Sequence, residues 1–74
     1  MTKLPSLTGD QVVKALSKAG FQVLRQRGSH IYLKHSDNRA TVVPIHKGES
    51  IGPGLLRKII RDTELSKEEF LKLF

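Results

Sequence analysis

Hydrophobic residues recur at helical spacing in two parts of the sequence. The first part lies between Thr8, which begins a capping-box pattern with Gln11, and Gly20, which supplies a left-handed stop. The second starts at Gly52-Pro53, because proline at the first helical position loses no hydrogen bond. The apolar positions are Val12, Val13, Leu16 and Ala19 in the first part and Leu55, Leu56, Ile59 and Ile60 in the second. Each part therefore predicts an amphipathic helix that needs a surface to lie on.

Between these helices the sequence changes to three short segments rich in β-branched and aromatic residues, which predict strands. The three predicted strands are residues 21–27, 30–36 and 39–45. Gly28-Ser29 has the length of a tight hairpin loop, and Asp37-Asn38 tolerates positive φ. Pro44 cannot donate to a ladder, so it marks a sheet edge or a strand end. The segments predict a three-stranded antiparallel meander.

A second capping box, Ser66 to Glu69, predicts a short last helix that Phe70, Leu71 and Phe74 would dock. The complete order is α-β-β-β-α(-α), which is an α+β fold class. We expect a three-stranded antiparallel sheet with the helices on one face and the other face open.

The length and composition of the chain limit the size of the domain and indicate where in the cell the protein is located. The chain has 74 residues, enough for one small domain, and no cysteine, which excludes disulfides, thiolate metal sites and a cysteine nucleophile. The first residues, 1–5, contain no apolar run that would serve as a signal peptide. No stretch approaches the roughly 18 apolar residues of a membrane span. We therefore expect a cytoplasmic protein with no membrane partner.

The chain is basic, and its net positive charge lies in residues 1–61. Thirteen Lys and Arg against seven Asp and Glu give a formal net charge of +6. Residues 1–61 hold eleven of the bases and three of the acids, whereas residues 62–74 have an acidic excess. A positive field attracts polyanions, of which nucleic acids are the commonest. The charge indicates a nucleic-acid partner, although many small proteins are basic without binding one.

Alternation along the second strand predicts which side chains face the helices. Ile31 and Leu33 are aliphatic and must face them. The side chains left facing solvent are His30, Tyr32 and Lys34. His35 falls on the inward side at the strand end, where a structural role is expected.

On the first strand, Phe21 and Val23 share the core-facing positions. Arg25 and Arg27 continue the same alternation beyond the core. Because arginine stems lie readily along apolar surface, we expect both guanidinium groups at the sheet rim near the Gly28-Ser29 turn.

The histidines do not fit a metal site. His30 and His35 are five residues apart, so on a regular strand they point to opposite faces, and the nearest carboxylate is Asp37 in the turn. No phosphate-loop or dinucleotide glycine pattern is present, and Ser29 beside His30 has no acid partner for a triad. The residues predict no metal and no small-molecule cofactor.

RNA cleavage suits these residues better, because it can use a single imidazole. The substrate brings its own nucleophile, the 2′-hydroxyl, and imidazole titrates near neutral pH and can move the proton. His30 is the candidate catalytic residue, with cationic side chains to hold the phosphate and Tyr32 to stack on a base. The candidate RNA-binding residues are Arg25, Arg27, Tyr32, Lys34, His46 and Lys47.

Three motifs in the same order carry a family resemblance. They are Gly28-Ser29-His30 after Arg25-Gln26-Arg27, Val43-Pro44-Ile45-His46, and residues 52–60. With them the chain resembles the HicA family of bacterial toxins over roughly residues 7–72. The resemblance implies a double-stranded-RNA-binding-domain-like fold, with residues 1–74 as one ribonuclease domain whose core spans about residues 7–72. It also implies a metal-independent endoribonuclease that cleaves mRNA and so arrests translation.

The resemblance further implies that His30 is the catalytic histidine and that Gly28 and Ser29 belong to its site. It implies a HicB-type antitoxin that covers the basic face. The leading hypothesis is the toxin of a type II toxin–antitoxin system acting on single-stranded RNA or mRNA. A non-catalytic RNA-binding module using the same basic sheet face is the alternative. A DNA-binding or purely protein-binding domain is a third reading.

Overall fold

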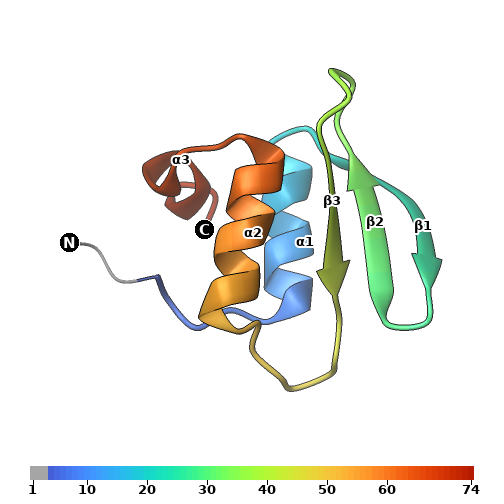
Figure 1. Cartoon of the computed structure of the whole chain (residues 1–74), viewed down its shortest axis with the longest axis vertical. Coiled ribbons are helices and arrows are strands. Elements are labelled where there is room, and N and C mark those ends of the chain that lie inside the picture. Colours follow the sequence, from blue (N-terminus) through green and yellow to red (C-terminus); the bar gives the residue numbers. More distant parts are fainter. Residues whose placement is uncertain (1–3) are drawn as a thin grey trace.

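The computed structural model describes residues 4–74 and has the predicted order of elements (Figure 1). Residues 1–3, part of the segment expected to lack a signal peptide, lie outside the described residues. The elements are α1 (Gly9–Lys18), β1 (Gln22–Arg27), β2 (His30–Lys34), β3 (Ala40–Pro44), α2 (Pro53–Thr63) and α3 (Lys67–Leu71). The strands form one antiparallel sheet in the order β1-β2-β3. The predicted α+β fold is confirmed.

The capping signals in the sequence set the starts of two helices. At α1 the Thr8 hydroxyl accepts from the Gln11 N–H at 3.3 Å, and the Gln11 side chain accepts from the Thr8 N–H at 2.9 Å. At α3, Ser66 and Glu69 exchange the same two bonds at 3.0 and 2.9 Å. Pro53 is the first residue of α2. Within residues 4–74, no helix combines the length and the apolar character that crossing a bilayer requires.

Each strand is shorter than predicted. The β2–β3 turn begins early: the N–H of His35 donates to the carbonyl of Arg39 at 2.8 Å, and that of Asn38 to the carbonyl of His35 at 2.9 Å. Asn38 takes a positive φ of 77° there, as predicted. Phe21 lies just before β1, so its backbone is not part of the strand. Its side chain is buried in the core.

The core lies between the helices and one face of the sheet. Figure 1 shows α1 and α2 alongside β3, with β1 on the edge of the sheet farthest from them. The buried side chains of β2 and β3 that face the helices are Ile31, Leu33, Thr41 and Val43. Every residue of β1 is exposed, because no helix reaches beneath that strand. The opposite face of the sheet remains open, as predicted.

An ionic cluster holds the β2–β3 turn against the helices. The Arg39 guanidinium donates to Asp37 at 2.9 Å and to the carbonyl of Thr63 at the end of α2 at 2.6 Å. It also lies over the Phe21 ring, 5.3 Å from the centroid. The hydrogen bond from Arg39 lowers the pKa of Asp37, and the same bond raises the pKa of Arg39. The turn is thereby fixed at the end of the sheet opposite the β1–β2 hairpin.

Candidate nucleic-acid interface

The open face of the sheet carries the outward residues of β2. His30 and Lys34 are exposed and Tyr32 is half-buried, whereas Ile31 and Leu33 between them are buried. Because successive side chains of a strand alternate between faces, His30, Tyr32 and Lys34 share the face away from the helices. Their predicted orientation is confirmed.

A β-bulge interrupts the alternation of β1. Val23 pairs with Leu33, but the next pair is Arg25 with Tyr32, so Leu24 is an extra residue. The side chain of Leu24 is 63% exposed. Beyond a bulge, the residues of the longer strand face the side opposite to the one that regular alternation would give.

The prediction for Arg25 and Arg27 was therefore wrong. Both lie on the open face instead of continuing the helix-facing positions: Arg25 is opposite Tyr32, and Arg27 is opposite His30. The sequence did contain a signal of the bulge, since regular alternation would direct two guanidinium groups towards the core side. Snorkelling at the rim explains that conflict without a bulge, but it gives both arginines the wrong face.

The hairpin before His30 holds the histidine at the end of the sheet. Gly28 and Ser29 form the predicted two-residue loop, with a φ of +59° at Gly28, which is the conformation that favours glycine at the first central position. The carbonyl of Ser29 accepts from the N–H of Ile45 at 2.6 Å, and the side chain of Gln26 donates to the carbonyl of Gly28 at 3.0 Å. Sequence reasoning missed the bracing role of Gln26.

Two of the candidate RNA-binding side chains are already in contact. The Arg25 guanidinium lies over the Tyr32 ring, 4.8 Å from its centroid. Lys34 is on the same face but four residues along β2 from His30, which is about 13 Å at the rise of a strand. The open face therefore gathers Arg25, Arg27, His30 and Tyr32 at one end and leaves Lys34 near the other.

His46 and Lys47 follow β3 in an exposed loop at the same end of the sheet as His30 (Figure 1). The N–H of Glu49 donates to the carbonyl of His46 at 2.9 Å, and Gly48 has a φ of +79°, so residues 46–49 form a tight turn. A hollow of about 220 Å³ opens beside this turn, with His46 and Glu49 in its wall. Glu49 was not among the predicted site residues.

His35 has a structural environment. Its ring packs edge-on against Phe21, with centroids 5.2 Å apart, and its Nδ1 accepts from the N–H of Asp37 at 3.2 Å. Its Nδ1 also lies 3.1 Å from the Asp37 carboxylate. Within residues 4–74, no three His, Asp or Glu side chains gather as metal ligands would.

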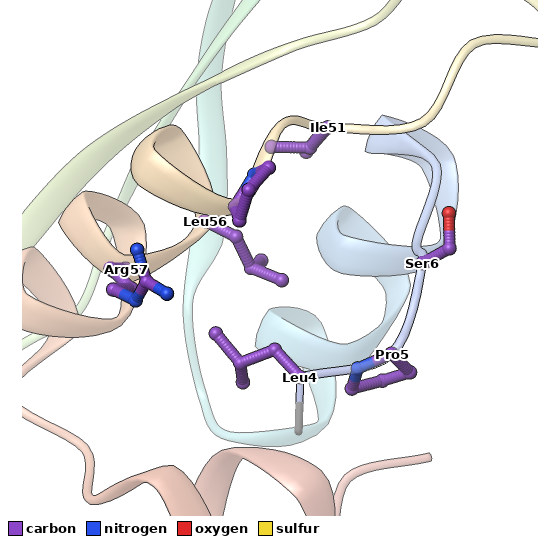
Figure 2. Close-up of a pocket in the computed structure, with 7 residues that line it drawn as sticks. Leu4, Pro5, Ser6, Ile51, Leu56 and Arg57 are labelled. Atoms are coloured by element: carbon purple, nitrogen blue, oxygen red, sulfur yellow. The ribbon is translucent and has the colours of Figure 1, made fainter.

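A larger hollow, about 360 Å³, lies between the N-terminal segment and the start of α2 (Figure 2). The side chains of Leu4 and Leu56 extend into it from its two walls, and Arg57 stands at its rim. None of the predicted site residues lines it. Among residues 4–74, Arg57 is the one ionisable side chain that lines this hollow, so the described part of its wall offers no side chain for acid–base catalysis near neutral pH.

Together, the α-β-β-β-α order and an open, cationic sheet face define a small α+β protein with a double-stranded-RNA-binding-domain-like fold. The family model described as HicA toxin of bacterial toxin–antitoxin matches residues 9–65 of this chain. The chain therefore belongs to the HicA toxin family, and its role is that of a toxin. A comparison with curated proteins found no match.

Proposed function

We propose that this toxin is a metal-independent endoribonuclease that cleaves mRNA and thereby inhibits translation, with His30 as the general acid or base. The observation that carries the proposal is the position of His30. Its imidazole is exposed on the open face. Arg27 lies directly opposite it, and the Arg25–Tyr32 pair lies two residues farther along both strands. Membership of the HicA family supports the same reading.

The reaction needs proton transfer and charge stabilisation, and these side chains supply both. The 2′-oxygen forms a bond to phosphorus while the bond to the 5′-oxygen breaks, which leaves a 2′,3′-cyclic phosphate and a 5′-hydroxyl. One proton leaves the 2′-hydroxyl and one reaches the 5′-oxygen, and His30 mediates this transfer. The guanidinium groups of Arg25 and Arg27 offset the negative charge that develops on the phosphoryl oxygens.

Substrate binding uses the surface around His30. In this proposal Gly28 and Ser29 let the RNA backbone approach the hairpin, and Tyr32 with Arg25 forms a stacking platform for a base. His46 and Lys47 extend the contact past the end of β3, and Lys34 binds a phosphate farther along the strand. A single RNA strand suits this surface because its bases are free to stack.

A HicB-type antitoxin is the proposed protein partner. To silence the toxin it must compete with RNA for the open face, so its contact surface is expected to be acidic or to insert groups beside His30. The excess positive charge of residues 1–61 favours such a partner.

The test is incubation of the purified protein and its His30→Ala variant with a long single-stranded RNA in excess EDTA. Lys14→Ala, an exposed change on α1 away from the sheet, is the control for the variant series. Wild type and Lys14→Ala should cleave the RNA and leave 2′,3′-cyclic phosphate ends, whereas His30→Ala should bind RNA but cleave it much more slowly. A general acid or base contributes about 10²–10⁴-fold, so the loss should be of that size.

Three results would overturn the proposal. Cleavage by His30→Ala at the wild-type rate would remove His30 from the chemistry. No cleavage by any variant, with tight and salt-sensitive binding by all, would identify a non-catalytic RNA-binding module. Cleavage of the matching DNA would also contradict the mechanism, because DNA lacks the 2′-hydroxyl nucleophile.

A further inference from the structure

The hollow of about 220 Å³ lies between the end of β3 and the start of α2. In Figure 1, the loop that joins these two elements lies at the same end of the sheet as the β1–β2 hairpin. Pro44, Ile51 and Leu55 supply apolar wall, and His46, Glu49 and Ser50 supply the polar groups. A concave, largely apolar surface with a few polar groups is typical of small-molecule sites, and a volume of about 220 Å³ limits the occupant to a small group such as a single ring system.

Pro44 connects the hollow to His30, because it lines the hollow and also lies opposite His30 in the sheet. These two residues pair directly across β2 and β3. The bond from the N–H of Ile45 to the carbonyl of Ser29 makes His30 and Pro44 a non-hydrogen-bonded pair, the kind in which side chains approach most closely. Pro44 is therefore shared between the surface around His30 and the wall of the hollow. A nucleotide whose phosphate lies at His30 has a neighbouring base within reach of it.

The walls are held in place before any ligand arrives. The N–H of Ile51 donates to the carbonyl of Leu7 at 2.7 Å, and the hydroxyl of Ser6 donates to that of Ser50 at 2.9 Å. On the opposite side, Gly48 closes the turn that sets Glu49 beside His46. A preformed site loses little conformational entropy on binding.

The charge of Glu49 limits what the hollow binds. Glu49 is one of only three acids among residues 1–61, and it stands beside a surface proposed to hold phosphate. A carboxylate accepts hydrogen bonds and donates none, and it repels phosphate. It therefore suits a ligand group with adjacent N–H donors. Guanine is the RNA base whose Watson–Crick edge offers two such donors side by side, N1–H and the N2 amino group, and these match the two carboxylate oxygens.

We propose that this hollow is a nucleobase subsite and that Glu49 selects guanine in it. The inference rests on the proposed function, in that it assigns a sequence preference to the RNA that reaches His30. The other bases fit less well: adenine and cytosine each present one amino donor beside an acceptor. Uracil presents one N–H between two carbonyl oxygens, which repel the carboxylate. Glu49 acts in this proposal as a specificity residue and takes no part in proton transfer to the phosphate.

Binding of RNA that cannot be cut tests the subsite separately from catalysis. The probes are short oligouridines in which every 2′-hydroxyl is replaced by fluorine, carrying one central guanine or one central inosine. Inosine lacks only the N2 amino group. Wild type should bind the guanine probe about tenfold more tightly than the inosine probe, and Glu49→Gln should bring the two affinities together. Glu68→Gln, an exposed change of the same kind on α3, should keep the difference.

The outcomes separate this inference from the proposed function. Equal affinity of wild type for the two probes, or a preference that survives in Glu49→Gln, overturns the subsite even if the enzyme cleaves RNA. A preference that requires Glu49 supports it even if His30 proves not to be catalytic. Mapping the cut sites of wild type on a long RNA provides a second check. Guanine should be enriched at one fixed position from the cut, and Glu49→Gln should erase that enrichment.

Discussion

Two single-residue deletions in β1 test which side chain the register of this strand places opposite Tyr32. The register after the bulge is fixed by the Gly28-Ser29 loop, which keeps Arg27 opposite His30. Deleting Leu24 removes the extra residue and leaves Arg25 opposite Tyr32. Deleting Gln26 also gives a regular strand, but it moves Arg25 opposite Ile31, towards the helix side, and places Leu24 opposite Tyr32. The two proteins have the same length and the same hairpin, and they differ in which side chain faces Tyr32.

The expected effect of losing Arg25 from the open face comes from its contacts. A hydrogen bond to a charged group contributes about 1.5–3 kcal/mol, and an exposed group lies at the low end of that range. The Arg25 guanidinium also stacks on the Tyr32 ring, 4.8 Å from its centroid, which holds both side chains in place for RNA and contributes about 0.5–1 kcal/mol more. The sum, about 2–2.5 kcal/mol, means that deletion of Gln26 should weaken RNA binding about 30–70-fold, and deletion of Leu24 should leave it close to wild type. Neither deletion should unfold the protein, because every residue of β1 is exposed.

Fluorescence anisotropy with an uncleavable single-stranded RNA, repeated over a series of salt concentrations, measures the effect. One lost phosphate contact lowers the slope of log affinity against log salt by about 0.7 for a single strand. That decrease is expected for the Gln26 deletion alone. Because the side chain of Gln26 also donates to the carbonyl of Gly28, Gln26→Ala serves as the control that removes this bond without changing the register.

Equal binding and equal salt slopes for the two deletions would refute the assignment of Arg25 to the open face. The same conclusion would follow if deletion of Leu24 were the more damaging change. A loss in Gln26→Ala as large as in the Gln26 deletion would attribute the effect to the hairpin and not to Arg25.

Two further predictions concern the stability of the fold. Phe70 is fully buried, so Phe70→Ala should cost about 3–5 kcal/mol of the free energy of unfolding measured with urea, a large part of the roughly 4–11 kcal/mol typical for this length. Phe74, which meets Phe70 edge-on but is 50% exposed, is the matched control, and Phe74→Ala should cost about 1 kcal/mol; equal costs would contradict the assigned core. The pKa of Asp37 is lowered in the folded protein by its bond from Arg39, so its contribution to stability is present above the ordinary value of 3.8 and is lost as the pH falls through the folded value. The difference in unfolding free energy between wild type and Asp37→Asn should therefore shrink on acidification, and a difference that grows would contradict the reasoning.

Most of the fold could be predicted from the sequence because its signals are local. The Thr8 and Ser66 capping boxes form as expected, and both hairpins turn where Gly28-Ser29 and Asp37-Asn38 indicate. Each of these structures depends on backbone geometry over a few residues, so the residue type alone carries the information. The strand ends were less accurate, because the turn bonds between His35, Asn38 and Arg39 decide them.

The site was predicted less completely because its geometry depends on pairing between strands. Alternation gave the right face for His30 and Tyr32 on the central strand, where burial on one side fixes the register. The edge strand β1 has no buried side to fix it, and the Leu24 bulge reversed the face of both arginines. The hollow beside Glu49 involves residues brought together only by the closure of α2 onto the sheet, which no local spacing records.

The bulge at Leu24 and the hollow beside Glu49 lie on either side of His30. The hairpin keeps Arg27 opposite His30 and Arg25 opposite Tyr32, and the extra residue Leu24 lets Val23 pair with Leu33 beyond them. The bulge thus combines both arginines on the open face with Val23 opposite the buried Leu33, and it also bends the exposed edge strand, which discourages pairing with another sheet. On the other side of His30, Pro44 has no N–H to donate, and on an edge strand at a non-hydrogen-bonded position this costs no ladder bond. The chain can therefore turn away after Pro44 and form the wall of the hollow, so that cations lie on one side of His30 and the proposed base subsite on the other.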